Sequence, residues 1–228
     1  MAMAMETGMA RETGMTAGTR QTATDEVLAG YAGLGADWIA RSDGLSCDEI
    51  YAPVTDLLPV EPGRVLDLGA ATGRDAAWLA GRGHRIVAVE PVKELREAGQ
   101  GLHPLEAVEW LDDRLPELER IGAGEMFDCV LANGVLHHLE PDAQEAAIRR
   151  LAGMLKVGGL LIASLRHGVG PSNRRAWPMD VEALVAMARA SGMALIRRID
   201  KGSIQPENRD AGITWTWLAL RRDGLPVV

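Results

Sequence analysis

The fold is decided by the stretch Val65-Leu66-Asp67-Leu68-Gly69-Ala70-Ala71-Thr72-Gly73-Arg74-Asp75. Its first four residues are mostly apolar, which is typical of a buried strand. A turn bounded by glycines follows, and residues 75–80 indicate the first turns of a helix with an acid near its N-terminus. A strand, a glycine turn and a helix in this order begin the ligand-binding edge of an open α/β sheet, where ligands lie outside the carboxyl ends of the strands.

The turn does not match two common phosphate-binding loops. A dinucleotide loop, Gly-x-Gly-x-x-Gly, would place its third glycine at Arg74, and a P-loop would need Gly-Lys-Ser or Gly-Lys-Thr, which is absent. No lysine lies near the turn, whereas Asp67 and Asp75 flank it. Two carboxylates suit a cationic ligand better than a pyrophosphate.

These residues resemble the first motif of the class I S-adenosylmethionine (SAM) methyltransferases, Asp-x-Gly-x-Gly-x-Gly at the end of the first strand. The chain has Asp67, Gly69, Ala71 and Gly73 at the motif positions, so alanine replaces the middle glycine. The resemblance covers about residues 48–222. It implies a Rossmann-like α/β fold, doubly wound on a seven-stranded, mostly parallel sheet whose last strand is antiparallel. A glycine turn in another kind of α/β protein is the alternative interpretation.

Glu90 is the second feature that indicates a cofactor site. An apolar strand-like run, residues 84–89, ends at Glu90 and Pro91, about 20 residues beyond Gly69. At this spacing a carboxylate accepts hydrogen bonds from both ribose hydroxyls of an adenosine ligand. The alternative is a carboxylate that only stabilises the N-terminus of the following helix.

The pattern of apolar and polar segments predicts alternating strands and helices in one domain, residues 24–228, after a disordered tail at 1–23. Two N-terminal helices are predicted at 25–39 and 48–58, and the resemblance implies that they form a cover (24–60) over a core (61–222). Tyr31, Trp38, Tyr51 and the loop 41–43 either face the site or pack elsewhere. Strands are predicted at 64–68, 84–89, 106–111, 127–132, 158–164, 194–200 and 213–221. Helices are predicted at 74–82, 92–100, 115–121, 141–154 and 179–191, and only a surface loop, including 205–209, joins the last two strands.

Composition restricts the class of protein. The net charge is −8, so the chain lacks the broad basic surface that nucleic-acid binding requires. Cys47 and Cys129 have no metal-motif spacing, which favours a reduced compartment and a cytoplasmic location. No apolar run is long enough for a membrane span, and the N-terminus lacks the apolar segment of a signal peptide. The sequence does not indicate the oligomeric state.

Further motifs of the family that the chain resembles supply candidate site residues. Asp112 and Asp113 follow the third strand, where an acid meets the adenine amino group and the next backbone amide, here that of Arg114, meets a ring nitrogen. The sequence does not choose between the two acids, and a solvated turn is the alternative. Asn133 and Gly134, in the fourth motif, are implied to lie beside the methionine part of the cofactor.

His137 and His138 come one turn later, on the substrate side. Adjacent residues of a helical turn point in different directions, so one histidine should face the pocket. We expect His137 to be the general base or an orienting group, with His138 as its competitor. A metal site is a weak alternative, because no third ligand is near in the sequence.

Two glycine-containing segments follow. Residues 155–160 match a helix end, a Gly-Gly turn and a strand, in which glycine permits a left-handed cap. The loop 164–175 contains Arg166, His167 and two further arginines, which can hold a carboxylate or a phosphate. A solvated loop is the alternative.

The sequence therefore predicts a SAM-dependent methyltransferase that acts on an oxygen or nitrogen atom of a small molecule, without a metal. The alternatives are methylation of RNA or protein, and a SAM-binding protein without turnover. Substrate contacts are expected from Arg166, His167 and Tyr51. Cofactor contacts are expected from Asp67, Gly69, Ala70, Ala71, Gly73, Glu90, Pro91, Asp112, Asp113, Arg114, Asn133 and Gly134.

Overall fold

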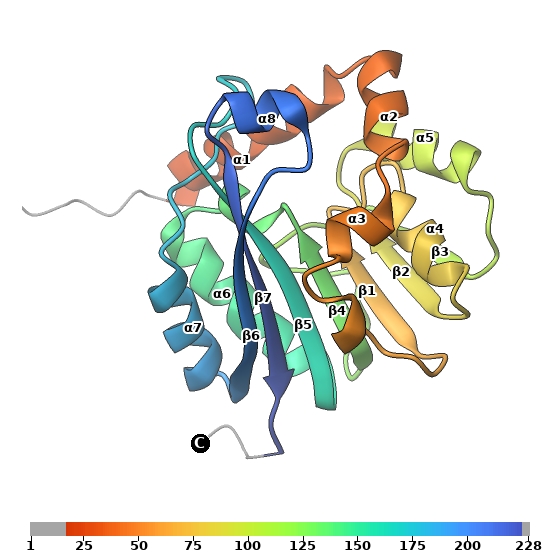
Figure 1. The fold of residues 1–228 in the computed structure, drawn as a ribbon, viewed down its shortest axis with the longest axis vertical. Coiled ribbons are helices and arrows are strands. Elements are labelled where there is room, and N and C mark those ends of the chain that lie inside the picture. The colour runs from red at the N-terminus through yellow and green to blue at the C-terminus, as the bar shows by residue number, and fades with distance from the viewer. Residues whose placement is uncertain (1–16, 225–228) are drawn as a thin grey trace, which may run out of the picture.

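The computed structural model describes residues 17–224, with side chains from residue 23 onward. Its centre is a seven-stranded sheet in the order β3-β2-β1-β4-β5-β7-β6 (Figure 1). The strands are β1 (Arg64–Leu68), β2 (Arg85–Val89), β3 (Val108–Leu111), β4 (Phe127–Asn133), β5 (Leu155–His167), β6 (Met193–Gly202) and β7 (Thr214–Arg222). Only β7 runs antiparallel to its neighbours, as the sequence predicts.

The direction of winding changes beside β1. The chain continues from β1 to β2 and β3 on one side, then returns to β4 and β5 on the other, and Leu66 lies opposite both Val87 and Val130. In open α/β sheets a crevice forms where the order reverses, at the carboxyl ends of the strands. The segments that follow β1, β2 and β4 therefore meet at this edge.

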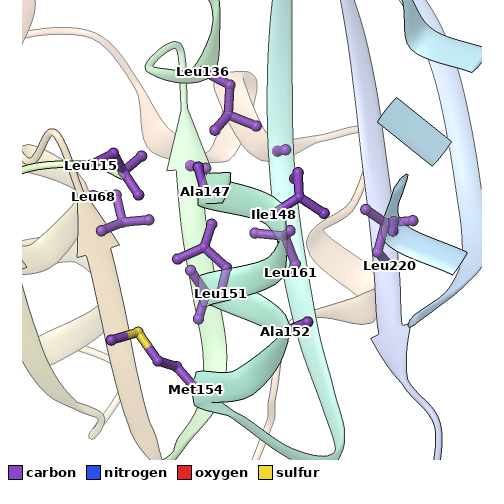
Figure 2. Close-up of a cluster of buried hydrophobic side chains, with 14 of the residues drawn as sticks. Leu68, Leu115, Leu136, Ala147, Ile148, Leu151, Ala152, Met154, Leu161 and Leu220 are labelled. Carbon is purple, nitrogen blue, oxygen red and sulfur yellow. The ribbon is translucent and has the colours of Figure 1, made fainter. Parts of the chain in front are cut away.

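Side chains alternate across the sheet, so each face has its own hydrophobic core. Leu66 and Leu68 face one core, which is covered by α6 (Pro141–Met154) and α7 (Val181–Ala190). Figure 2 shows Ile148 and Leu151 of α6 against Leu161 of β5. Val65 faces the other core, which is covered by α3 (Cys47–Tyr51) and α4 (Arg74–Ala80). A fifth helix, α5 (Lys93–Leu102), follows β2.

The N-terminal cover differs from its prediction in its boundaries. The helix α1 (Ala17–Ala32) includes residues 17–23, which the sequence analysis places in the tail, and good helix formers such as alanine and glutamine account for the extension. Residues 1–16 lie outside the described part of the chain. A separate helix, α2 (Ala36–Asp43), follows because glycines at 33 and 35 interrupt the pattern. The predicted helix 48–58 is only α3 and a 3-10 turn, Thr55–Leu57, since Pro53 ends the regular helix.

Three later predictions also need correction. Residues 115–121 form turns rather than a helix, because Pro116 lacks an N–H and Leu118 has a φ of 49°. The helix α6 passes directly into β5, so Gly158 (φ 83°) lies inside the strand and not at a helix cap. Between β6 and β7 lies a short helix, α8 (Pro206–Asp210), in place of the predicted loop.

The cover lies at the end of the sheet towards which the parallel strands run. In Figure 1, α1, α2 and α8 gather there, along the upper edge of the sheet. None of the helices within residues 17–224 is long and apolar enough to cross a bilayer.

Candidate functional site

A cavity of about 420 Å³ lies at the carboxyl ends of β1, β2 and β4. This volume is in the usual range for small-molecule sites. The N-terminal cover closes it from above with Tyr31, Trp38 and Ser42, which the sequence left undecided between the site and the core. The expected site residues that line it are Gly69, Ala70, Ala71, Glu90, Pro91, Asp113, Arg114, Asn133, Gly134, His137, His138 and Arg166.

The glycine turn after β1 has the tight backbone that a close-approaching ligand needs. Gly69 and Gly73 have φ angles of 63° and 77°, in the left-handed region that favours glycine. A side chain at Gly69 would place its Cβ 3.1 Å from Cγ2 of Val135. Ala71 also has a positive φ, 49°, although it is not glycine. The turn therefore takes the conformation of a glycine motif at the one position where the glycine is missing.

Glu90 links this turn to the end of β2. One carboxylate oxygen accepts a 2.8 Å hydrogen bond from the N–H of Ala71, and the other accepts one of the same length from the N–H of Val92. Burial raises the pKa of Glu90 to about 7, against the effect of these two hydrogen bonds. Each oxygen keeps a second lone pair, so the carboxylate can also accept hydroxyl donors in the cavity.

Asp75, at the start of α4, lines the cavity and is the centre of a hydrogen-bond network that connects α3, α4, β4 and β5. It accepts hydrogen bonds from the Tyr51 hydroxyl (2.6 Å), the Arg74 Nε (2.7 Å) and the Asn133 side-chain amide (2.9 Å). The Asn133 oxygen in turn accepts from the Ser164 hydroxyl at 2.7 Å. This network fixes the orientation of the Asn133 amide between β4 and β5.

The two carboxylates that flank the turn do not act as two free negative charges. Burial, and then the charge of Asp75, raise the pKa of Asp67 well above its usual range, which favours its uncharged form. Burial also acts to raise the pKa of Asp75, but the ion pair with Arg74 and the hydrogen bonds hold it below its usual value. The two carboxylates therefore attract a cationic ligand less strongly than the sequence suggests, because Arg74 neutralises Asp75.

The structure distinguishes the two acids after β3. Asp113 lines the cavity, and its oxygens accept hydrogen bonds from the N–H groups of Arg114 (2.8 Å) and Arg120 (2.7 Å). Asp112 lies outside the cavity lining, is half exposed and pairs with Arg96 at 3.1 Å. Asp113 is therefore the acid that the fold brings to the site.

His138 is held by hydrogen bonds at both ring nitrogens. Its Nδ1 lies 2.7 Å from the backbone oxygen of Arg175, and its Nε2 lies 2.9 Å from the Tyr31 hydroxyl. A carbonyl oxygen only accepts, so Nδ1 carries the hydrogen. Burial lowers the pKa of His138, so the ring is neutral and Nε2 accepts from Tyr31.

His137 has a different environment. It is buried, and its Nδ1 has no hydrogen-bond partner among the residues that the structure describes. Burial, and then the nearby groups of His138 and Arg166, lower its pKa well below 6.5. The ring lies against Trp215, with a centroid distance of 6.0 Å. His137 is therefore a neutral imidazole in the cavity wall, without the two bonds that hold His138.

Some expected site residues lie elsewhere. Tyr51 is fully buried and bonded to Asp75, so it does not face the cavity. His167 points away from it and bonds to Thr216 at 2.8 Å. Asp67 and Gly73 lie behind the turn and support it without lining the cavity. The direction of the Tyr51 side chain is set by its position around the helix α3, and that of His167 by the pleat of β5. Sequence spacing alone does not determine either direction.

Other lining residues were missed in the sequence. Trp215 of β7 lies opposite Arg166 of β5 in the antiparallel pair, which brings it to the same edge. Gln205 and Asn208, in a segment expected only at the surface, also line the cavity. The alternating pattern at 214–217 indicates a strand that contains Trp215. It does not indicate at which end of the sheet Trp215 would lie.

Within residues 17–224, no three His, Cys, Asp or Glu side chains come close enough to hold a metal ion. The expectation that the reaction needs no metal stays a prediction. The cavity does suit an adenosine-containing cofactor, because one wall carries a buried carboxylate and a left-handed glycine turn, and Asp113 lies beyond them. Cys47 and Cys129 are both unpaired and buried.

Residues 65–159 match the family model of a methyltransferase domain. This segment of the chain is therefore similar to a methyltransferase domain. The match contains the glycine turn, Glu90 and the His137–His138 pair, so the segments that the sequence singled out lie inside the family region. The fold and the cavity extend beyond the matched segment, since β6 and β7 complete the sheet and the N-terminal cover helps to line the cavity.

Similar proteins agree with this family. Ubiquinone biosynthesis O-methyltransferase of Methylocella silvestris is 33% identical over 125 residues, which are 54% of this chain and 46% of that protein. A protein of the same name from Bradyrhizobium diazoefficiens is 33% identical over 101 residues, 44% of this chain and 39% of its own length. The chain thus spans less than half the length of these two curated relatives.

Solved structures show the same fold over most of the chain. The 1,6-didemethyltoxoflavin N1-methyltransferase of Burkholderia thailandensis, crystallised with 1,6-didemethyltoxoflavin and S-adenosylhomocysteine (SAH), superposes with a TM-score of 0.70, at 23% identity and over 93% of both chains. The [4+2]-cyclase SpnF superposes with a TM-score of 0.61, at 18% identity, over 77% of this chain and 80% of its own. At these identities the likeness concerns the fold.

Proposed function

We propose that the protein is a SAM-dependent methyltransferase that transfers a methyl group to an oxygen or nitrogen atom of a small molecule in the cytoplasm. One observation carries the proposal. The glycine turn at Gly69, the carboxylate of Glu90 and the imidazole of His137 line a single cavity at the carboxyl edge of the sheet. The methyltransferase family match covers the same three segments.

Each wall of the cavity has a part in holding the cofactor. Glu90 would accept the ribose hydroxyls, Asp113 and the Arg114 amide would hold the adenine, and Asn133 and Gly134 would lie beside the methionine portion. Bound SAM would supply a methyl group on a positively charged sulfur. The Asp75 network keeps Asn133 in place beneath this position.

The protein then has to align the acceptor and remove its proton. Trp215, Trp38 and Tyr31 form an aromatic wall that orients a small acceptor, and orientation supplies much of the acceleration in a displacement reaction. His137 is neutral near pH 7 because burial lowers its pKa, so its ring can accept a proton there. His138 serves as a positioning residue that connects Tyr31 to the loop after β5.

Transfer of radiolabelled methyl groups from SAM tests the proposal. Low-molecular-weight extract, total RNA and total protein from the source organism are separate acceptors, and label is expected in the small-molecule fraction alone. Gly69→Val is the control, because a bulky side chain at φ 63° strains the turn and contacts Val135. Label found only in RNA or protein would show that the acceptor is a macromolecule and not a small molecule.

A protein that binds SAM without turnover is the second candidate. This chain shares its fold with the [4+2]-cyclase SpnF, and one fold can carry different chemistries. Cofactor binding therefore needs a test that is separate from methyl transfer. Calorimetry with SAH measures cofactor binding independently of any acceptor. Tight SAH binding with no transfer to any of the three fractions would support a binding role instead of methyl transfer.

A further inference from the structure

Arg166 and Arg174 are cations in the cavity wall that form no ion pair with any residue that the structure describes. Two other arginines of the lining are neutralised, Arg74 by Asp75 (2.7 Å) and Arg114 by Asp25 (3.2 Å). Among the described residues, Arg166 donates only to the backbone oxygen of Gly168, at 3.0 Å. The Nε of Arg174 is buried and has no hydrogen-bond partner in the described chain.

The two guanidinium groups act on the same region of the cavity. Arg166 lies at the end of β5, opposite Trp215, and Arg174 lies over the Tyr31 ring at 5.1 Å. After burial, the charge of Arg174 contributes to lowering the pKa of Arg166, and both arginines contribute to lowering the pKa of His138. Two partly buried like charges repel each other, and a bound anion would offset that repulsion.

The loop that carries Arg174 is held in position from two sides. A Cβ added to Gly30 of α1 would lie 1.8 Å from the backbone oxygen of Asn173, so helix and loop are in direct contact. On the other side of Arg174, the backbone oxygen of Arg175 accepts the hydrogen bond from His138. The guanidinium is therefore presented by a fixed backbone, and binding an anion there needs little additional ordering.

Resting on the methyl-transfer function above, we propose that Arg166 and Arg174 bind an oxyanion group, a carboxylate or a phosphate, of the methyl acceptor. Both lie beside His137 and His138, across β4 from the Glu90 and Asp113 side of the sheet. Guanidinium groups hold such oxyanions with charge-assisted and often bidentate hydrogen bonds. The acceptor is therefore a small acid, with its nucleophilic atom near His137 and its acidic group at the arginines.

The test measures binding of simple acids to the SAH-saturated protein by calorimetry. The probes are benzoate, phenyl phosphate and the neutral benzamide, each with one aromatic ring for the wall at Trp215. The variants are Arg166→Gln and Arg174→Gln, and Arg175→Gln is the matched control, because it removes an exposed charge next to Arg174 and keeps the backbone bond to His138. Thermal melts confirm folding. If a glutamine variant does not fold, lysine at the same position (Arg166→Lys or Arg174→Lys) replaces it, and it should also weaken acid binding because it lacks the bidentate guanidinium.

We expect at least one acid to bind while benzamide does not, with an affinity that falls as salt rises. Each glutamine variant at 166 and 174 should weaken that binding about tenfold or more, and Arg175→Gln should leave it within about twofold. The acid that binds more tightly identifies the oxyanion as a carboxylate or a phosphate. SAH affinity should be unchanged in all variants.

Four results would overturn the inference: no binding of either acid, equal binding of benzamide, equal loss in Arg175→Gln, or a loss of SAH affinity at 166 and 174. The last result would mean that the arginines bind the carboxylate of the cofactor itself. Failure of the parent protein to bind SAH would contradict the proposed function instead, so the two failures are distinguishable.

Discussion

The hydroxyl of Tyr51 donates a 2.6 Å hydrogen bond to Oδ2 of Asp75, and both side chains are buried. Tyr51→Phe removes this donor and leaves the carboxylate with Arg74, Asn133 and the Cys47 thiol. Losing a hydrogen bond to a buried charged group should lower the free energy of unfolding by about 1–3 kcal/mol, measured by urea denaturation. Because Tyr51 does not line the cavity, affinity for the acceptor should stay the same. A variant as stable as the parent would show that the other donors suffice.

Ala71 is the position where the turn departs from the glycine motif, and it has a φ of 49°. Ala71→Gly should raise the free energy of unfolding by about 1 kcal/mol, because only glycine takes this conformation without a steric cost. Ala70→Gly is the matched control: its φ is not positive, so added chain freedom should lower stability by about 0.5–1 kcal/mol. Equal effects of the two substitutions in urea denaturation would contradict the strain at Ala71.

Glu90 should make cofactor binding depend on pH. Its pKa is raised to about 7 by burial, so part of the free protein carries a proton on Glu90 near neutrality. Ribose hydroxyls donate to the ionised form, so SAH binding should release a proton and tighten as pH rises through about 7. Calorimetry in buffers of different ionisation enthalpy counts that proton. Glu90→Gln should bind more weakly and with a flat pH profile, and a pH-dependent Glu90→Gln protein would assign the effect to another group.

The raised pKa of Glu90 has the opposite effect on the stability of the ligand-free protein, which should fall as pH rises. The folded state holds the Glu90 proton more tightly than the unfolded chain, whose pKa is near 4.5. The contribution to stability is therefore complete below about pH 4.5 and is lost as pH rises through about 7. Urea denaturation of the parent and of Glu90→Gln across this window separates this effect from ligand binding.

The strands of the core were predictable because each is an apolar run bounded by turn residues. The run before Asp67 and the run before Glu90 become β1 and β2 with nearly the predicted boundaries. Helix boundaries failed where one residue changes the backbone locally, as at Leu118 with its positive φ. The same limit applies to the Gly-Gly segment, where pairing of Leu155 with Phe127 extends β5 over the expected cap.

The candidate site was predictable where its residues follow strand ends, as Gly69, Glu90 and Asn133 do. The direction of a side chain was not, since it depends on tertiary packing. Tyr51 turns into the core to meet Asp75, and His167 turns to Thr216. The roles of Trp215 and Arg174 depend on strand pairing and on the contact of a loop with α1, which are long-range relationships.

Once an acceptor is found, substitutions of the two histidines after β4 should have different effects on kcat and KM. His137→Ala should lower kcat by about 10²-fold or more if this ring accepts the proton of the nucleophile, with SAH affinity unchanged. His138→Ala should instead raise KM and reduce stability, because it removes the connection between Tyr31 and Arg175.

The pH profile gives the sharper distinction. The pKa of His137 is held well below 6.5, so the base is already neutral at pH 6.5. At saturating SAM, where the Glu90 effect on cofactor binding does not limit the rate, kcat/KM for the acceptor should stay flat above that pH and fall only in more acidic solution. The unfolded chain binds the proton more readily, so stability from this group is complete above about pH 6.5 and is lost as pH falls. A rate within a few-fold of the parent in His137→Ala, or a catalytic loss confined to His138→Ala, would remove His137 from the reaction.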